Sequence, residues 1–256
     1  MTVEYEVSGG RATVTIDDPE RRNPMSVATM AGLLARTQEA LDDPDVRVIV
    51  YTGAGEEAFS AGGDLSGPFV DDPIGLHHGR GDIARLFRAM MGGGKPTIAR
   101  VNGHAIAGGL GLAVACDITI CVDDAKLGTS EVKVGLWPMM ISALMVRAMP
   151  SKAALEMMLT GRLIDPAEAL RLGLVSRVVP RGELDETVDE VVSSLMELSP
   201  ATLMMGKDSF YGMSDSALDI ALDRLQGGLT EIASTDDAAE GVTAFIEKRA
   251  PDWSGR

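Results

Sequence analysis

The sequence predicts an α/β protein, because strand-like segments alternate with helix-like segments over its N-terminal part. Residues 3–7 and 12–16 alternate apolar and polar side chains around a Ser-Gly-Gly turn at 8–10, which predicts a β-hairpin. Residues 46–52 are apolar and rich in β-branched side chains, as expected for a strand buried on both faces. From about residue 139 onward the pattern is mainly helical.

The other elements of the N-terminal part follow in chain order. Ser26 is suited to cap a helix over 27–41, because its hydroxyl can accept a hydrogen bond from a first-turn N–H. A second helix is predicted near 82–91, ahead of three glycines that end it. Strands are predicted over 96–101 and 118–122, so that strand, loop, helix and strand succeed one another.

The C-terminal part carries one strong helix start, at Asp165. This cap is followed by Pro166 in the first helical position and by Glu168 three residues after the cap, and Gly173 is suited to end the helix. A short strand is predicted over 175–179, and helices are predicted over 184–198, 203–212, 217–233 and 237–248. With Pro200 as the expected hinge, we divide the chain into an α/β core, residues 1–198, and a C-terminal helical region, residues 199–256.

Composition limits the classes of function. The 256 residues include 23 basic and 38 acidic side chains, and the net charge of −15 disfavours nucleic acid and anionic membranes as partners. No apolar run approaches the ~20 residues of a membrane-spanning helix, and no signal peptide pattern opens the sequence. Cys116 and Cys121 lie in or beside apolar segments, which predicts reduced, buried thiols and a cytoplasmic location. With three histidines and no metal-binding motif, we expect no metal site.

Three motifs invite other interpretations. Residues 53–58 fit the dinucleotide fingerprint GxGxxA, but the glycine-rich sequence after them cannot open the helix that the fingerprint requires. Residues 58–62 are one glycine short of a GxSxG nucleophile motif, and no histidine has a matching context. A set of methionines has helical spacing, which is typical of core packing, with a pliable acyl pocket as the alternative. These methionines are Met139, Met140, Met145, Met149, Met157 and Met158.

Two small-residue turns are the strongest indication of a site. FSAGGDL, residues 59–65, and HAIAGGLGLA, residues 104–113, each leave a strand without bulky side chains, so a peptide N–H can approach a ligand. If Gly108 begins a helix, its N–H has no acceptor within that helix and lies at the positive end of the dipole. A second N–H at Gly63 would complete an oxyanion hole able to stabilise an enolate formed from a thioester, in which one donor is commonly worth roughly 3 kcal/mol.

Segments along nearly the whole chain resemble the crotonase superfamily, the enoyl-CoA hydratase/isomerase group. The two turns match its two oxyanion loops, and the segment GTSEVKVGL resembles the one that carries a catalytic glutamate. The segments that carry the resemblance are 23–26, 59–64, 101–117, 128–136, 159–162, 167–169, 173–175 and 244–249. The resemblance implies a spiral of ββα units whose C-terminal helical region packs in trimers, so we expect a homotrimer or a dimer of trimers.

The resemblance also implies the roles of particular residues. Gly63 and Gly108 would be the oxyanion donors and Glu131 the acid/base at the α and β carbons of an acyl-CoA thioester. No cofactor is expected, because coenzyme A is part of the substrate. Residues implied to bind coenzyme A are Arg22, Ala61, Gly62, Asp64, Leu65, Phe245 and Lys248, of which Phe245 and Lys248 act from a neighbouring subunit in many relatives.

Gly111 departs from the pattern of this group. Typical two-glutamate hydratases carry their first glutamate at this position, which is three residues after Gly108 and so is expected to face the same site. A glycine is expected to leave room there and to leave Glu131 as a lone acid, which favours Δ3–Δ2 enoyl-CoA isomerisation. Because hydratases are the larger class and include single-acid members, enoyl-CoA hydratase is the leading prediction. Isomerase is its alternative, and a non-catalytic acyl-CoA-binding subunit is the alternative from another class.

Overall fold

The computed structural model describes residues 3–65 and 73–256, and its largest sheet has six strands in the order β1-β2-β4-β7-β9-β12. The hairpin is confirmed, since β1 and β2 pair antiparallel, and each later strand pairs parallel to its neighbour. The last strand begins at Arg177 rather than at the predicted residue 175, and beside it the N–H of Thr119 donates to the hydroxyl of Ser176 instead of to a main-chain carbonyl. The strands are β1 (Val3–Ser8), β2 (Arg11–Ile16), β4 (Val48–Gly53), β7 (Thr97–Val101), β9 (Ile118–Val122) and β12 (Arg177–Val179).

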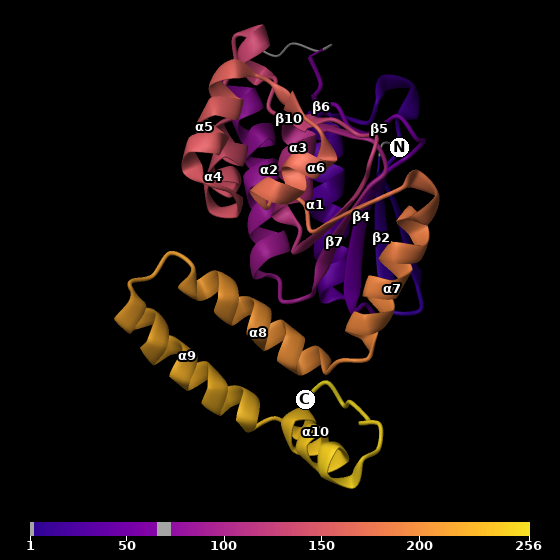
Figure 1. The fold of residues 1–256 in the computed structure, drawn as a ribbon, viewed down its shortest axis with the longest axis vertical. Coiled ribbons are helices and arrows are strands. Elements are labelled where there is room, and N and C mark those ends of the chain that lie inside the picture. The colour runs from indigo at the N-terminus through magenta and orange to yellow at the C-terminus, as the bar shows by residue number, and fades with distance from the viewer. Residues whose placement is uncertain (1–2, 66–72) are drawn as a thin grey trace.

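A second sheet of very short strands was not predicted, because two or three residues carry no readable periodicity. Its order is β11-β10-β8-β5, and a separate pair joins β3 to β6. The strands are β3 (Pro24–Met25), β5 (Ala58–Ser60), β6 (Gly62–Gly63), β8 (His104–Ile106), β10 (Leu127–Gly128) and β11 (Leu163–Ile164). This small sheet lies above the end of the large one and carries the glycine-rich turns (Figure 1).

Two predicted helix starts are confirmed in detail. Ser26 accepts a hydrogen bond from Thr29 N at the start of the first helix, and Asp165 accepts one from Glu168 N. The second helix begins well before the predicted residue 82. The helices around the sheets are α1 (Val27–Asp42), α2 (Pro73–Gly92), α3 (Gly108–Ala115), α4 (Met139–Ala148), α5 (Ser151–Thr160), α6 (Pro166–Leu172) and α7 (Leu184–Met196).

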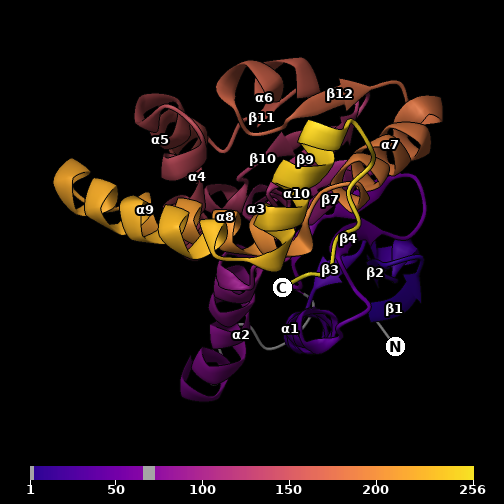
Figure 2. The same cartoon turned by 90° about the horizontal axis from the view of Figure 1, so that it is seen from below.

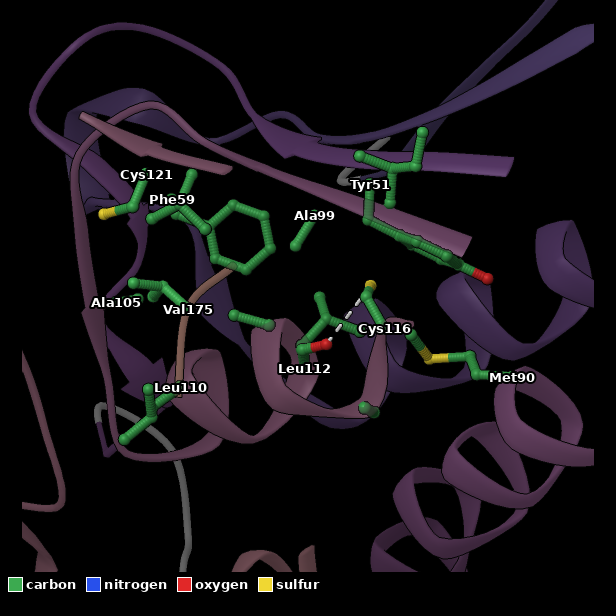
Figure 3. Packing of buried hydrophobic residues seen from close by; sticks show 14 of the residues in the cluster. Tyr51, Phe59, Met90, Ala99, Ala105, Leu110, Leu112, Cys116, Cys121 and Val175 are labelled. Atoms are coloured by element: carbon green, nitrogen blue, oxygen red, sulfur yellow. Dashed lines mark hydrogen bonds between the residues drawn. The ribbon is translucent and has the colours of Figure 1, made fainter. Parts of the chain in front are cut away.

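The centre of the core is α3, which is apolar on all sides, as expected of a helix enclosed by other elements. Leu110 and Leu112 are fully buried there, and so are Phe59 and Tyr51, which belong to the same core (Figure 3). Cys116 Sγ donates to Leu112 O at 3.5 Å. Both cysteines are free and buried, as predicted, and burial raises the pKa of the Cys121 thiol to about 12.

The C-terminal helices α8 (Pro200–Met213), α9 (Leu218–Ala233) and α10 (Asp236–Glu247) lie along one end of the core, and α9 extends away from it (Figures 1 and 2). Pro200 is the first residue of α8, capped by the Ser199 hydroxyl. Lys207 joins α8 to the core, because its Nζ donates to Met90 O, to Lys95 O and to Asp117 Oδ2. No helix among the described residues is long and apolar enough to cross a membrane.

Candidate active site

Three parallel strands bring the predicted site residues to one edge of the small sheet. Central β8 pairs with β10, so that Ile106 lies opposite Gly128, and it pairs with β5 on its other side. Gly108 follows β8 by two residues and Glu131 follows β10 by three. Gly63 comes just after β5 in the same direction. Since the carboxyl ends of parallel strands meet at one edge, the register of β8 places these residues around a common space.

Ala107 redirects the chain from β8 into α3. It has φ 52° and ψ −124°, a conformation rare for any residue other than glycine, which costs roughly 1–3 kcal/mol. Its N–H donates to Gly128 O at 2.8 Å, which holds the strained turn against β10. Gly108 is therefore the first residue of α3, as predicted, and its N–H has no acceptor within the helix.

The first glycine turn, at Gly62 and Gly63, lies in close contact with Ala107. Gly62 has φ +88°, and a Cβ there would lie 2.6 Å from Ala107 Cβ and 3.2 Å from Gly108 N. Asp64 donates its N–H toward Met25 O of β3. Because successive N–H groups of a strand point to opposite sides, that of Gly63 points away from β3. A Cβ built on Gly108 would lie 4.0 Å from Gly63 N, so the two amides lie close together.

Glu131 begins a 3₁₀ turn, η2 (Glu131–Val134), and is half-buried. Its Oε2 is buried, and nothing among the described residues hydrogen-bonds it. Burial raises the pKa of this carboxyl above its ordinary value, and an interaction with its own backbone offsets part of that effect. A carboxyl group with a raised pKa and one buried oxygen that accepts no hydrogen bond is suited to take up and return a proton.

A cavity of about 650 Å³ joins these groups. Its lining is largely apolar, and among the described lining residues Glu131 is the only acid and Arg80 the only base. The residues that line it are Met25, Met30, Ala61, Gly63, Leu65, Arg80, Ile83, Ala107, Gly108, Ser130, Glu131, Val134, Gly135, Leu136, Trp137, Pro138, Met139, Met140 and Ile141. The arrangement can hold an apolar acyl group with its carbonyl oxygen at two amides and its carbons near one carboxylate.

The expectation that Gly111 leaves room in the site is wrong. A Cβ on Gly111 would collide with Cγ2 of Ile141 and would lie 3.2 Å from Phe87 Cζ. The space beside α3 is filled by these two side chains, from α4 and α2. Ile141 lines the cavity there and Gly111 does not, so a glutamate at 111 could enter only if Ile141 moved.

Two buried asparagines hold the loops around the site. Asn23 donates to Ala54 O and Ala58 O and accepts from Asp18 N. Asn102 donates its side-chain amide to Gly53 O and Gly55 O and accepts from Gly53 N. These amides satisfy buried backbone groups that no regular ladder pairs, so they fix the chain that leads into β5.

Of the residues implied to bind coenzyme A, some line the cavity or lie beside it, and others lie far from it. Ala61 and Leu65 line the cavity, whereas Gly62 backs onto Ala107. Asp64 forms an ion pair with Arg21 at 2.7 Å, and Arg22 forms one with Glu57 at 2.6 Å.

Phe245 and Lys248 belong to α10 and its C-cap, which lie at the opposite end of the molecule from the small sheet (Figure 1). A single chain therefore does not bring these two residues to the cavity. Phe245 is 84% exposed, so its ring has little contact with the rest of its own chain.

The methionines divide between the two interpretations. Met139 and Met140 line the cavity, whereas Met145, Met149, Met157 and Met158 are buried in the core. Nothing in the sequence predicted the other apolar residues that line the cavity, because they come from distant segments. Three of these are Met25, Ile83 and Trp137.

The two rejected motifs serve the fold. Residues 53–58 run from the end of β4 to the start of β5 and open no helix. Ser60 is fully buried, and its hydroxyl accepts the N–H of Gly62 at 3.2 Å. Over residues 3–65 and 73–256, no three His, Cys, Asp or Glu side chains lie together as metal ligands would.

Known proteins are similar to this chain in fold and in sequence along nearly its full length. Residues 6–256 match the enoyl-CoA hydratase/isomerase family. A provisionally named enoyl-CoA hydratase of Thermus thermophilus is 38% identical over 248 residues, covering 95% of this chain and 97% of the relative. Carnitinyl-CoA dehydratase of Escherichia coli K12 is 34% identical over 254 residues, covering 97% of each chain. The crystal structure of an enoyl-CoA hydratase from Mycobacterium smegmatis superimposes with a TM-score of 0.94 at 30% identity and covers 99% of each chain.

The chain therefore belongs to the enoyl-CoA hydratase/isomerase family, and it is an enzyme of the crotonase fold. Members of this family act on acyl-CoA thioesters.

Proposed function

We propose that this enzyme acts on enoyl-CoA thioesters with Glu131 as its single acid/base. We propose further that its main reaction shifts the double bond from C3–C4 to C2–C3 of the acyl chain. The observation that carries the proposal is the buried, unpaired Oε2 of Glu131 on the wall of an apolar cavity that Gly63 and Gly108 also line. Ile141 supports the choice of reaction, because it fills the space beside Gly111 where a second carboxylate would stand.

The chemistry needs no other reactant. The Glu131 carboxylate takes a proton from C2 of a 3-enoyl thioester, and the electron pair spreads into a dienolate. The amides of Gly63 and Gly108 stabilise the charge on the thioester oxygen. The carboxylic acid then returns its proton to C4, which gives the 2-enoyl thioester with unchanged mass.

Hydration is the second candidate, and the names of the relatives favour it. The relatives from Thermus thermophilus and Escherichia coli are named as a hydratase and a dehydratase. In that reaction Glu131 would activate a water molecule for addition to C3 of a 2-enoyl thioester.

We extend the proposal to the assembly and to coenzyme A. Exposed apolar residues of α10, including Phe245 and Ile246, support packing of this helix on another copy of the chain. In a homotrimer, or in a dimer of trimers, α10 of one copy would bring Phe245 and Lys248 to the coenzyme A of its neighbour. Arg22 and Asp64 would lie along the same coenzyme A.

Incubation with matched 2-enoyl- and 3-enoyl-CoA thioesters tests the proposal, with the products separated by chromatography and their masses measured by mass spectrometry. Isomerisation leaves the mass unchanged and hydration adds one water. We expect Glu131→Gln to lower turnover of the 3-enoyl thioester at least about a thousandfold while binding persists. An unchanged rate would favour a non-catalytic acyl-CoA-binding subunit or a different base.

A further inference from the structure

We infer that Ile141 limits how far an apolar acyl group can reach into the cavity, and that it thereby selects compact acyl chains. The inference rests on the proposed function, since it assumes that the cavity holds the acyl part of a thioester. It concerns a residue outside the proton-transfer machinery.

The exposure of the lining residues gives the cavity a direction. Val134 and Met139 are 57% and 72% exposed, so they form its rim. Met25, Ile83 and Ile141 are each at most 5% exposed, so they form its floor. An acyl group that enters past the rim therefore ends against Ile141 and its neighbours.

Ile141 closes this floor against a solid support. It lies in the first turn of α4, and α4, α3 and α2 pack side by side (Figure 1). Behind its Cγ2 is the bare backbone of Gly111, and Phe87 Cζ reaches the same point from α2. A β-branched side chain has few rotamers, so Ile141 cannot swing aside into space that is already filled.

Truncation of Ile141 would open the floor in one direction only. Ile141→Ala removes the methyl groups that stand between the cavity and Gly111, and Phe87 borders the space that is gained. This space is apolar and continuous with the cavity, so additional methylenes of a longer chain could occupy it. Ile141→Val removes less and keeps the branched shape.

The test is calorimetric binding of two saturated thioesters, butanoyl-CoA and octanoyl-CoA, which have no double bond and cannot turn over. We expect Ile141→Ala to improve octanoyl-CoA binding relative to butanoyl-CoA by about tenfold, and Ile141→Val to shift the ratio less in the same direction. Leu144→Ala is the matched control, because Leu144 is also buried on α4 but does not line the cavity. Its ratio should equal that of the wild type.

An unchanged ratio in a folded Ile141→Ala variant would overturn the inference and leave the proposed function standing. If that variant does not fold, an unchanged ratio in Ile141→Val has the same force. Failure of the wild type to bind either thioester would instead refute the proposed function itself.

Discussion

The contact between the two glycine turns leaves no room for a side chain on Gly62. Gly62→Ala places a side chain at φ +88°, which costs roughly 1–2 kcal/mol. The new Cβ would lie 2.6 Å from Ala107 Cβ and 2.7 Å from Ile106 O, so the turns must separate, at a further cost of roughly 1–3 kcal/mol. We expect the free energy of unfolding to fall by about 3 kcal/mol.

The same displacement should also affect catalysis. Because it moves the amides of Gly63 and Gly108 apart, we expect turnover of enoyl-CoA to fall about a hundredfold. Stability is measured by urea unfolding followed by circular dichroism, and turnover by product formation at saturating substrate.

Gly63→Ala is the control for this prediction. A Cβ on Gly63 has no atom within 4 Å, so the variant should unfold within about 0.5 kcal/mol of the wild type. If Gly62→Ala were as stable as Gly63→Ala, the close approach of the two turns would be wrong. If it were unstable but fully active, catalysis would not depend on the spacing of the two amides.

Two further predictions concern Glu131 and Lys207. Because burial raises the pKa of Glu131 above its ordinary 4.5, the acid limb of kcat/KM should lie above that value, with activity gained as pH rises. The neutral form is favoured in the folded state, so its contribution to stability is present below pH 4.5 and is lost as pH rises through the folded pKa. Glu131→Gln should therefore resist urea better than the wild type at pH 7 and match it in acid, and a less stable variant at pH 7 would contradict the burial. Lys207→Met leaves Asp117 without its cation and two carbonyls without a donor, so the free energy of unfolding, measured in urea, should fall by about 3 kcal/mol. Lys152→Met, at an exposed lysine, is the control and should change the free energy of unfolding little. Equal effects of the two lysine variants would show that this partly buried ion pair does not hold α8 to the core.

Local signals in the sequence predicted much of the fold. Ser26 and Asp165 cap their helices as predicted, because a cap is a contact between residues three apart. The hairpin and the long parallel strands also follow from patterns within a few residues.

The short strands and the walls of the cavity could not be predicted in this way. The strand β10 has two residues, and its place beside β8 depends on pairing between distant segments. Ala107 adopts a conformation typical of glycine. The sequence would sooner place that conformation at one of the two glycines that follow it. The error at Gly111 has the same origin, because Ile141 lies far along the chain and nothing near Gly111 indicates what fills the space beside it.

The pairing of β8 with β10 makes the alignment of two distant peptide segments a determinant of chemistry. A slip of one residue would displace the helix start by about 3.3 Å relative to the carboxylate and turn alternate side chains to the opposite face. A form of the protein in which these strands are only partly paired therefore cannot hold the active site in its catalytic geometry. Enzymatic rate would thus report on native strand alignment, and during refolding it should return no earlier than the last of these pairings.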